Sequence, residues 1–250
     1  MIPVSSKNSF EPVTETGWRM GFSTLFKKEL KTWFGTNAWW QQAGLWSLIL
    51  VLFGSATIAD PDAGVFIFYF MAMIFPGIAI IIISQERILE EKRSGSAAWV
   101  LSKPVSRTAF IIAKLIPSAL GFCFSMILIP GILFYVVANI LGAALPLGTY
   151  LLTLIPLMLW QLFLSWLTMC LATFFEKEGP VMAVPFPFLF IGPTLAQHPL
   201  YGPYGPWGLL MNSINLINGE PYPIYPVVIT LFLLLLFAIL AVLRFRQHEF

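Results

Sequence analysis

The chain has 250 residues, of which 58% are hydrophobic and only 10% are charged, and its mean hydropathy is +0.82. Soluble domains carry about 25% charged residues, so this composition excludes an ordinary water-soluble fold and indicates an integral membrane protein. The formal net charge of +2 comes from Lys and Arg gathered on one side of the predicted spans, so it gives no indication of nucleic-acid binding.

The N-terminal part is predicted to lie outside the membrane core. Residues 1–17 form a polar cytosolic tail, and residues 18–36 form an amphipathic helix on the cytosolic leaflet. Glu29 lies close to the centre of the apolar face, where it either bends toward headgroups or meets a cation on a partner or in the 85–107 loop. The apolar face of this helix consists of Trp18, Phe22, Leu25, Phe26, Leu30 and Trp33.

Residues 37–250 are predicted to form an all-α transmembrane domain. Uncharged stretches are long enough for spans of about 20 residues, and helices satisfy every backbone polar group inside hydrocarbon. Turn residues divide the stretches into six spans, near 38–59, 64–84, 112–138, 149–173, 180–197 and 225–243.

Proline marks two irregular regions of this domain. The fifth span contains four prolines and is expected to be broken or partly re-entrant. The Pro/Tyr/Gly-rich segment that follows it is expected to form an outer cap with one or two short helices near 206–217.

Orientation follows from the positive-inside rule. All Lys and Arg residues fall on one side of the six spans, whereas Asp60, Asp62 and Glu220 lie on the other. The sequence therefore predicts a multi-pass protein of the cell membrane with both termini in the cytosol.

Several catalytic signatures are absent from the sequence. It contains no G-x-x-x-x-G-K-[ST] phosphate loop, no H-E-x-x-H pair and no G-x-S-x-G elbow, and its histidines are His198 and His248. Cys123 and Cys170 lie in mid-span, where thiols usually pack as apolar groups. We expect no catalytic, cofactor-binding or metal site, and the lack of ionisable residues within the spans disfavours an ion-driven carrier.

The predicted cytosolic loop from Gln85 to Lys114 contains the most informative combination of charged, apolar and turn residues in the sequence. Gly95 is a natural terminator for the helix that continues the second span, and the apolar segment SAAWVL follows it. Trp99 and its apolar neighbours should not face water unless they meet the membrane or a partner's groove. The loop therefore presents an apolar knob between charged flanks.

The same residues resemble a known family. EKRSG (91–95), LSKPVSR (101–107) and Lys114 are similar to the first cytosolic loop of ABC transporter permeases of the type-2 export family. LFKKEL, with Lys28 and Glu29, resembles the connecting helix of that family, and FRQHEF resembles its C-terminal ending. The resemblance implies a coupling helix whose contacts with an ATP-binding subunit include Glu91, Gly95, Trp99, Leu101, Pro104 and Arg107.

This resemblance implies a permease subunit of an ATP-driven exporter. The permease would form the translocation path with a second, identical or related permease chain, and two separate ATP-binding subunits would hold the ATP and Mg²⁺. A non-transporting membrane scaffold remains an alternative, as does an intramembrane enzyme. Polar candidates within the spans for such an enzyme are Gln41, Gln42, Asn139, Gln161 and Ser165.

Overall fold

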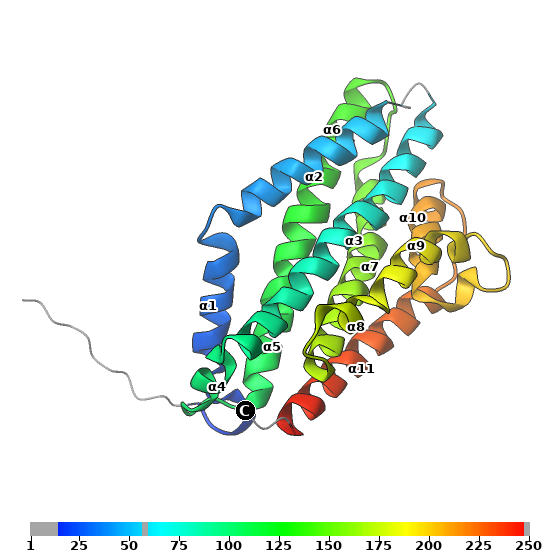
Figure 1. The fold of residues 1–250 in the computed structure, drawn as a ribbon. Helices are drawn as coiled ribbons and strands as arrows, with labels where there is room; N and C mark the ends of the chain where they lie inside the picture. The colour runs from blue at the N-terminus through cyan, green and yellow to red at the C-terminus, as the bar shows by residue number, and fades with distance from the viewer. Residues whose placement is uncertain (1–14, 57–59, 248–250) are drawn as a thin grey trace, which may run out of the picture.

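The computed structural model describes residues 15–56 and 60–247, and these form helices without strands (Figure 1). The N-terminal tail is therefore described only from Glu15 onward, and His248 and the end of FRQHEF lie outside the described residues. The α-helices are α1 Phe22–Phe34, α2 Ala38–Ser55, α3 Pro61–Arg93, α4 Ser96–Leu101, α5 Arg107–Phe122, α6 Ile129–Ile140, α7 Leu147–Phe174, α8 Glu178–Met182, α9 Pro185–Ala196, α10 Leu209–Ile217 and α11 Tyr225–Gln247.

Five helical segments of the described chain are long and apolar enough to cross a membrane, and they match the second to sixth predicted spans. The predicted first span corresponds to α2, which is not among the five because Gln41 and Gln42 lower the hydropathy of its first turns. The count of six spans stays a prediction. The five segments are Asp62–Arg93, Arg107–Ile140, Leu147–Phe174, Glu178–Ala196 and Tyr225–Gln247.

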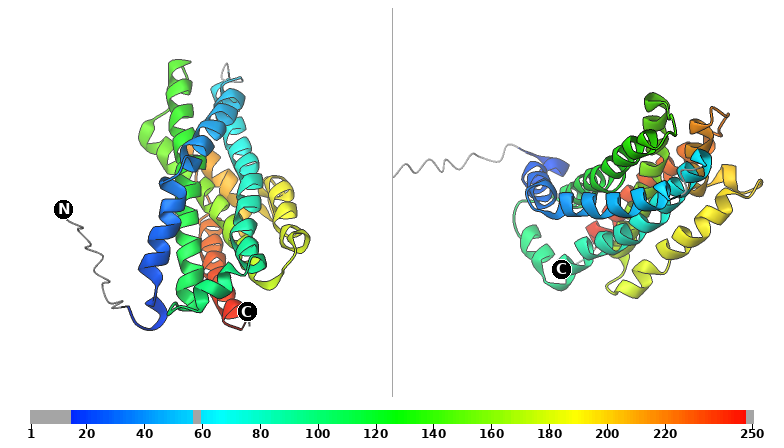
Figure 2. Two further views of the ribbon diagram at one scale, coloured as in Figure 1. Left: turned by 60° about the vertical axis from the view of Figure 1, so that its left-hand side comes forward. Right: turned by 90° about the horizontal axis from the view of Figure 1, so that it is seen from above.

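Helix α7 occupies the centre of the bundle, where α3, α10 and α11 pack against it (Figures 1 and 2). Its Tyr150 and Trp160 are fully buried within one apolar cluster. A second cluster lies toward the α4 end of the bundle and includes Phe110 of α5 and Phe245 of α11, whose rings stack 4.9 Å apart. Large side chains therefore fill the interior of the bundle.

The third predicted span continues from α5 through a π-helical segment, Cys123–Leu128, into α6. Together these elements form one helical span from Arg107 to Ile140, which begins before the predicted residue 112. Such π-helical segments are uncommon and often lie at functional positions in helices.

The fifth span is broken, as predicted from its prolines. Helix α8 ends at Met182, and α9 begins at Pro185 after the turn at Ala183 and Val184. Pro185 and Pro187 carry no backbone N–H, so they cannot donate to the carbonyls of Val181 and Ala183. The backbone therefore cannot continue the α-helical hydrogen bonds across this point.

The segment after the fifth span contains α10, in agreement with the short helices predicted near 206–217. Leu209 and Leu210 of α10 are fully buried. The Ser213 hydroxyl donates to the carbonyl of Thr153 in α7 at 2.9 Å. The segment is thus packed onto the bundle, and α10 lies beside α7 (Figure 1).

Helix α1 packs along α5, which gives part of its apolar face to protein instead of lipid. Trp33 is only 3% exposed, and its ring lies 5.1 Å from that of Phe122. Gly121 allows this approach, because a Cβ atom there would lie 2.4 Å from the Trp33 ring. Trp18, at the other end of the predicted face, remains half exposed.

Candidate functional site

In the loop between the second and third predicted spans, a turn at Gly95 separates the end of one helix from a second, short helix. Helix α3 ends at Arg93, and Gly95 adopts a left-handed conformation with φ of +71° directly before α4. A Cβ atom at Gly95 would meet nothing within 4 Å. Backbone conformation, and not lack of space, therefore favours glycine at the position predicted to terminate the helix.

Helix α4 is anchored on one side and exposed on the other. Ala97 is fully buried, whereas Trp99 is 64% exposed. The Lys103 ammonium lies 3.5 Å from the centroid of the Trp99 ring, which is close enough for a cation–π interaction. The anchored α4 therefore presents a large aromatic side chain to its surroundings, with a positive charge on one ring face.

A groove of about 330 Å³ separates α4 from α1. Most of its lining is apolar, and its charged residues are Lys28 and Lys103. The predicted interface residues Trp99 and Pro104 border this groove, while Leu101 is half-buried against the second apolar cluster. The groove is lined by Gly21, Thr24, Leu25, Lys28, Trp99, Val100, Lys103, Pro104 and Val105.

An ionic cluster lies behind the groove and joins α1, α3 and α5. Glu29 is 6% exposed and forms ion pairs with Arg87 at 3.1 Å and with Lys114 at 3.4 Å. Lys114 also meets Glu91 at 2.9 Å, and the exposed Lys28 lies 3.8 Å from Glu91. Of the two expectations for Glu29, the one that places it against a cation of the 85–107 loop is confirmed by Arg87.

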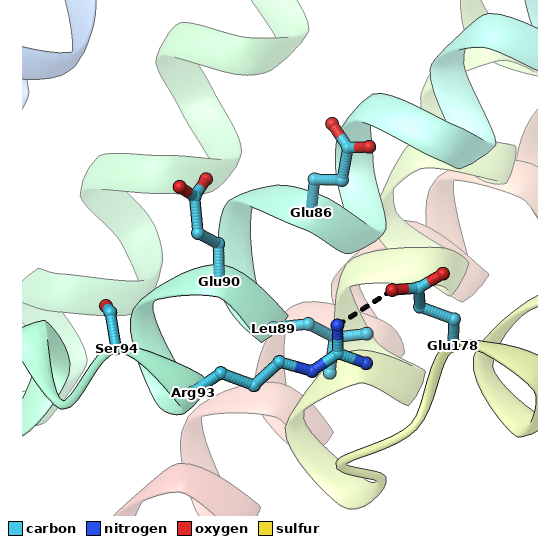
Figure 3. Close-up of a pocket in the computed structure, with 6 residues that line it drawn as sticks. All are labelled: Glu86, Leu89, Glu90, Arg93, Ser94 and Glu178. Atoms are coloured by element: carbon cyan, nitrogen blue, oxygen red, sulfur yellow. Dashed lines mark hydrogen bonds and ion pairs between the residues drawn. The ribbon is translucent and has the colours of Figure 1, made fainter.

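The remaining charged residues of the EKR sequence also make contacts within the chain. The Lys92 ammonium donates to three carbonyl groups at the end of α7, and Arg93 pairs with Glu178 at 2.7 Å (Figure 3). Beside this pair is a hollow of about 590 Å³, bordered by Glu86 and Glu90. The spacing of charges along the sequence gave no sign of the carbonyl contacts of Lys92.

Within the chain, Arg107 joins α5 to the end of α11, and its predicted contact with a partner stays a prediction. Its guanidinium donates to the carbonyl of Arg246, and Arg246 donates to the Thr108 hydroxyl at 2.8 Å. Apart from the half-buried Leu101, the predicted interface residues therefore form two groups. Gly95, Trp99 and Pro104 are exposed at the loop, whereas Glu91 and Arg107 hold helices of the chain together.

Polar residues within the predicted spans stabilise the helices. The Gln161 amide donates to the carbonyl of Ala72 at 2.7 Å, and the Ser165 hydroxyl lies 3.0 Å from that of Ser84. The Asn139 amide donates to the carbonyl of Tyr135, one turn earlier in α6. Among residues 15–56 and 60–247, no group of three His, Cys, Asp or Glu side chains could hold a metal ion.

The remaining candidates lie in α2. The Gln42 side chain accepts a hydrogen bond from the Trp46 indole at 2.8 Å, and Gln41 is exposed. Gln41 and Gln42 therefore belong to a different helix from Gln161 and Ser165, which lie in α7.

The family described as ABC-2 family transporter protein matches residues 14–219, a range that contains α1 to α10. Comparison with curated proteins finds no match. The matched range includes the exposed α4, the groove and the ionic cluster. The chain therefore belongs to the ABC-2 family of transporter proteins, as a multi-pass membrane permease.

Proposed function

We propose that this permease is the membrane subunit of an ATP-driven exporter and that α4 is its coupling helix. The observation that carries the proposal is the 64% exposure of Trp99 on a helix whose other side is anchored by the fully buried Ala97. A large aromatic residue on a short charged loop is typical of an interface anchor. We infer that α4 inserts into a groove of a separate ATP-binding subunit.

The energy source would be external to this chain. No glycine-rich phosphate loop occurs in its 250 residues, so the ATP and Mg²⁺ would be held by the partner. ATP hydrolysis in that subunit would move α4, and the movement would open a path for the exported substrate. The permease itself would carry out no covalent chemistry.

The path would form between two permease chains, identical or related, each bound to one ATP-binding subunit. Fully buried side chains, Tyr150 and Trp160 of α7 and Phe134 of α6, fill the centre of the described bundle. A substrate path through that centre would require these rings to move. A boundary between two bundles provides the space without dismantling either core.

The test is purification of the full-length chain, with an affinity tag, from cells that express it naturally. We expect an ATP-hydrolysing protein to copurify with the wild type and to be lost from Trp99→Glu, which places a charge in a desolvated groove. Trp40→Ala is the control, because Trp40 is 51% exposed but lies on α2. Absence of any ATPase from the wild-type preparation would contradict the proposal and favour a membrane scaffold.

A further inference from the structure

Three consecutive residues at the end of α3 bind three different parts of the chain. Successive residues of an α-helix point about 100° apart, so Glu91, Lys92 and Arg93 face different neighbours. Glu91 belongs to the ionic cluster with Lys114, while Lys92 contacts the end of α7 and Arg93 pairs with Glu178 of α8. The end of α3 is therefore a junction directly before α4.

Lys92 binds the end of α7. The final carbonyl groups of a helix have no partner within it, and they carry the negative end of the helix dipole. The Lys92 ammonium lies 3.3 Å from the carbonyl oxygen of Ala172, 3.4 Å from that of Thr173 and 3.0 Å from that of Phe175. One cation therefore links α3 to the C-terminal turn of the central helix.

Arg93 binds the segment that leads into the broken fifth span. Its guanidinium donates to the carbonyl of Glu176 at 3.3 and 3.4 Å. It also donates to the carboxylate of Glu178 at 2.7 Å, the contact drawn in Figure 3. Both side chains of the ion pair are half exposed, so the pair adds little stability. Its several directional contacts nevertheless fix the start of α8 relative to α3.

Apolar packing connects the same elements. Ala97 of α4 and Val181 of α8 are both fully buried, and they belong to one cluster with Leu89 of α3. Only Ser94 and Gly95 separate Arg93 from the first residue of α4. A displacement of α4 therefore acts on the junction and on the start of the fifth span together.

The fifth span is well suited to respond. Of the 18-residue apolar stretch in this span, 33% is buried inside the bundle, compared with 67% for the corresponding stretch of α7. Its backbone is interrupted at Ala183 and Val184, where the following prolines cannot supply helical N–H groups. The two parts of the fifth span, α8 and α9, can therefore change their angle relative to each other at this break.

We propose that Lys92 and Arg93 are positioning residues that transmit the displacement of α4 to the fifth span, with the break at 183–184 as the hinge. This inference rests on the proposed function of α4 as a coupling helix. It assigns the two side chains a role in transmission within the permease, and not in binding of the ATP-binding subunit.

The experiment uses the full-length permease with its copurified ATP-binding subunit. A bimane fluorophore is attached at Thr194→Cys, an exposed position on α9, after Cys123→Ala and Cys170→Ala. ATP with orthovanadate should change the bimane emission of the parent complex. In Lys92→Met and Arg93→Gln the change should fall about fivefold or more, while retention of the ATP-binding subunit stays at the parental amount.

Conservative and charge-swapped variants distinguish a loss of transmission from a loss of folding. Lys92→Arg keeps a cation against α7 and should restore the emission change. The pair Arg93→Glu with Glu178→Arg should restore it as well. Lys177→Met, which removes an exposed charge beside Glu178, is the control and should match the parent.

The outcomes distinguish the two proposals. Release of the subunit by Trp99→Glu, together with parental emission changes in Lys92→Met and Arg93→Gln, would overturn the transmission role and leave the coupling-helix proposal standing. Retention in Trp99→Glu would contradict the proposed function itself. If Lys92→Met or Arg93→Gln does not fold, failure of both Lys92→Arg and the charge-swapped pair to restore the signal would overturn the inference.

Discussion

The Gln161 side-chain amide of α7 donates a hydrogen bond of 2.7 Å to the carbonyl of Ala72 in α3. Ala72 lies four residues before Pro76, so its carbonyl is the one that a proline at that position leaves without a helical N–H. Gln161 also lies 3.3 Å from the carbonyl of Met73, which accepts from the Trp160 indole at 3.1 Å. Gln161 thus replaces the donor that Pro76 removes, and its neighbour Trp160 donates to the next carbonyl, in keeping with the need to satisfy backbone groups inside a membrane.

Gln161→Leu should destabilise the folded permease. The substitution leaves the buried carbonyl of Ala72 without its donor, which costs about 1–3 kcal/mol. Unfolding of the purified chain in mixed micelles measures the loss. Pro76→Ala supplies the missing N–H, so Gln161→Leu should cost less in a Pro76→Ala background. Equal costs in the two backgrounds would contradict the assigned role of Gln161.

The ionic cluster behind α4 gives a second stability prediction. Lys114→Met leaves the carboxylates of Glu29 and Glu91 without their shared cation, and breaking a buried pair in this way costs about 3–5 kcal/mol. Adding Glu91→Gln removes the carboxylate that lies nearer to Lys114 and should recover part of the loss. Thermal unfolding of the single and double variants measures both changes.

Lys28→Met is the matched control for this prediction. Lys28 also pairs with Glu91, but at 3.8 Å and with 56% of its side chain exposed, and an exposed pair contributes about 0–1 kcal/mol at most. The two lysines therefore differ in burial while they share a partner. A loss for Lys28→Met as large as that for Lys114→Met would show that burial does not determine the contribution.

Local sequence signals predicted the helices and breaks of this fold well. Gly95 marks the turn before α4 through its backbone conformation, and Pro185 marks the break in the fifth span. These effects act within a few residues, so they can be read from the chain. The contact of Lys92 with Ala172 joins residues 80 positions apart, and only tertiary packing sets it.

The difference between local signals and tertiary packing also explains which features of the candidate site could be predicted from the sequence. The exposure of Trp99 follows from a short apolar helix between charged segments, which the sequence displays. The direction of Arg107 depends on where α11 ends, which the sequence of the loop does not contain. Some residues of one motif are therefore exposed while others bond within the chain, and no local signal in the sequence distinguishes them.

Truncation of the exposed aromatic on α4 should weaken the complex with the ATP-binding subunit. Loss of an interface anchor costs about 2 kcal/mol or more, which corresponds to about a thirtyfold rise in Kd. We therefore expect Trp99→Ala to weaken binding by about that factor in a titration of the subunit against permease in nanodiscs. Trp99→Phe should retain more of the affinity than Trp99→Ala. Equal affinities for wild type and Trp99→Ala would contradict the anchor role.

Membrane orientation is the last prediction, and it follows from the distribution of Lys and Arg along the chain. Positive charges are retained on the cytosolic side, so Lys103 and Lys177 should lie in the cytosol, whereas Asp60, Gly148 and Glu220 should lie outside. Single cysteines at these positions, in the Cys123→Ala and Cys170→Ala background, are treated in intact cells with a membrane-impermeant maleimide. Reaction at 60, 148 and 220 is expected.

Positions 103 and 177 should react only after the cells are opened, which also controls for cysteines that are buried instead of cytosolic. The five positions lie between successive predicted spans, so their pattern tests the second to fifth spans together with the orientation, and a cysteine at position 7 extends the test to the first. In particular, α2 must cross the membrane for position 60 to be outside while the N-terminal residues are inside. A cysteine at position 7 that reacts from outside, along with position 60, would show that α2 does not cross, and the span count would fall to five.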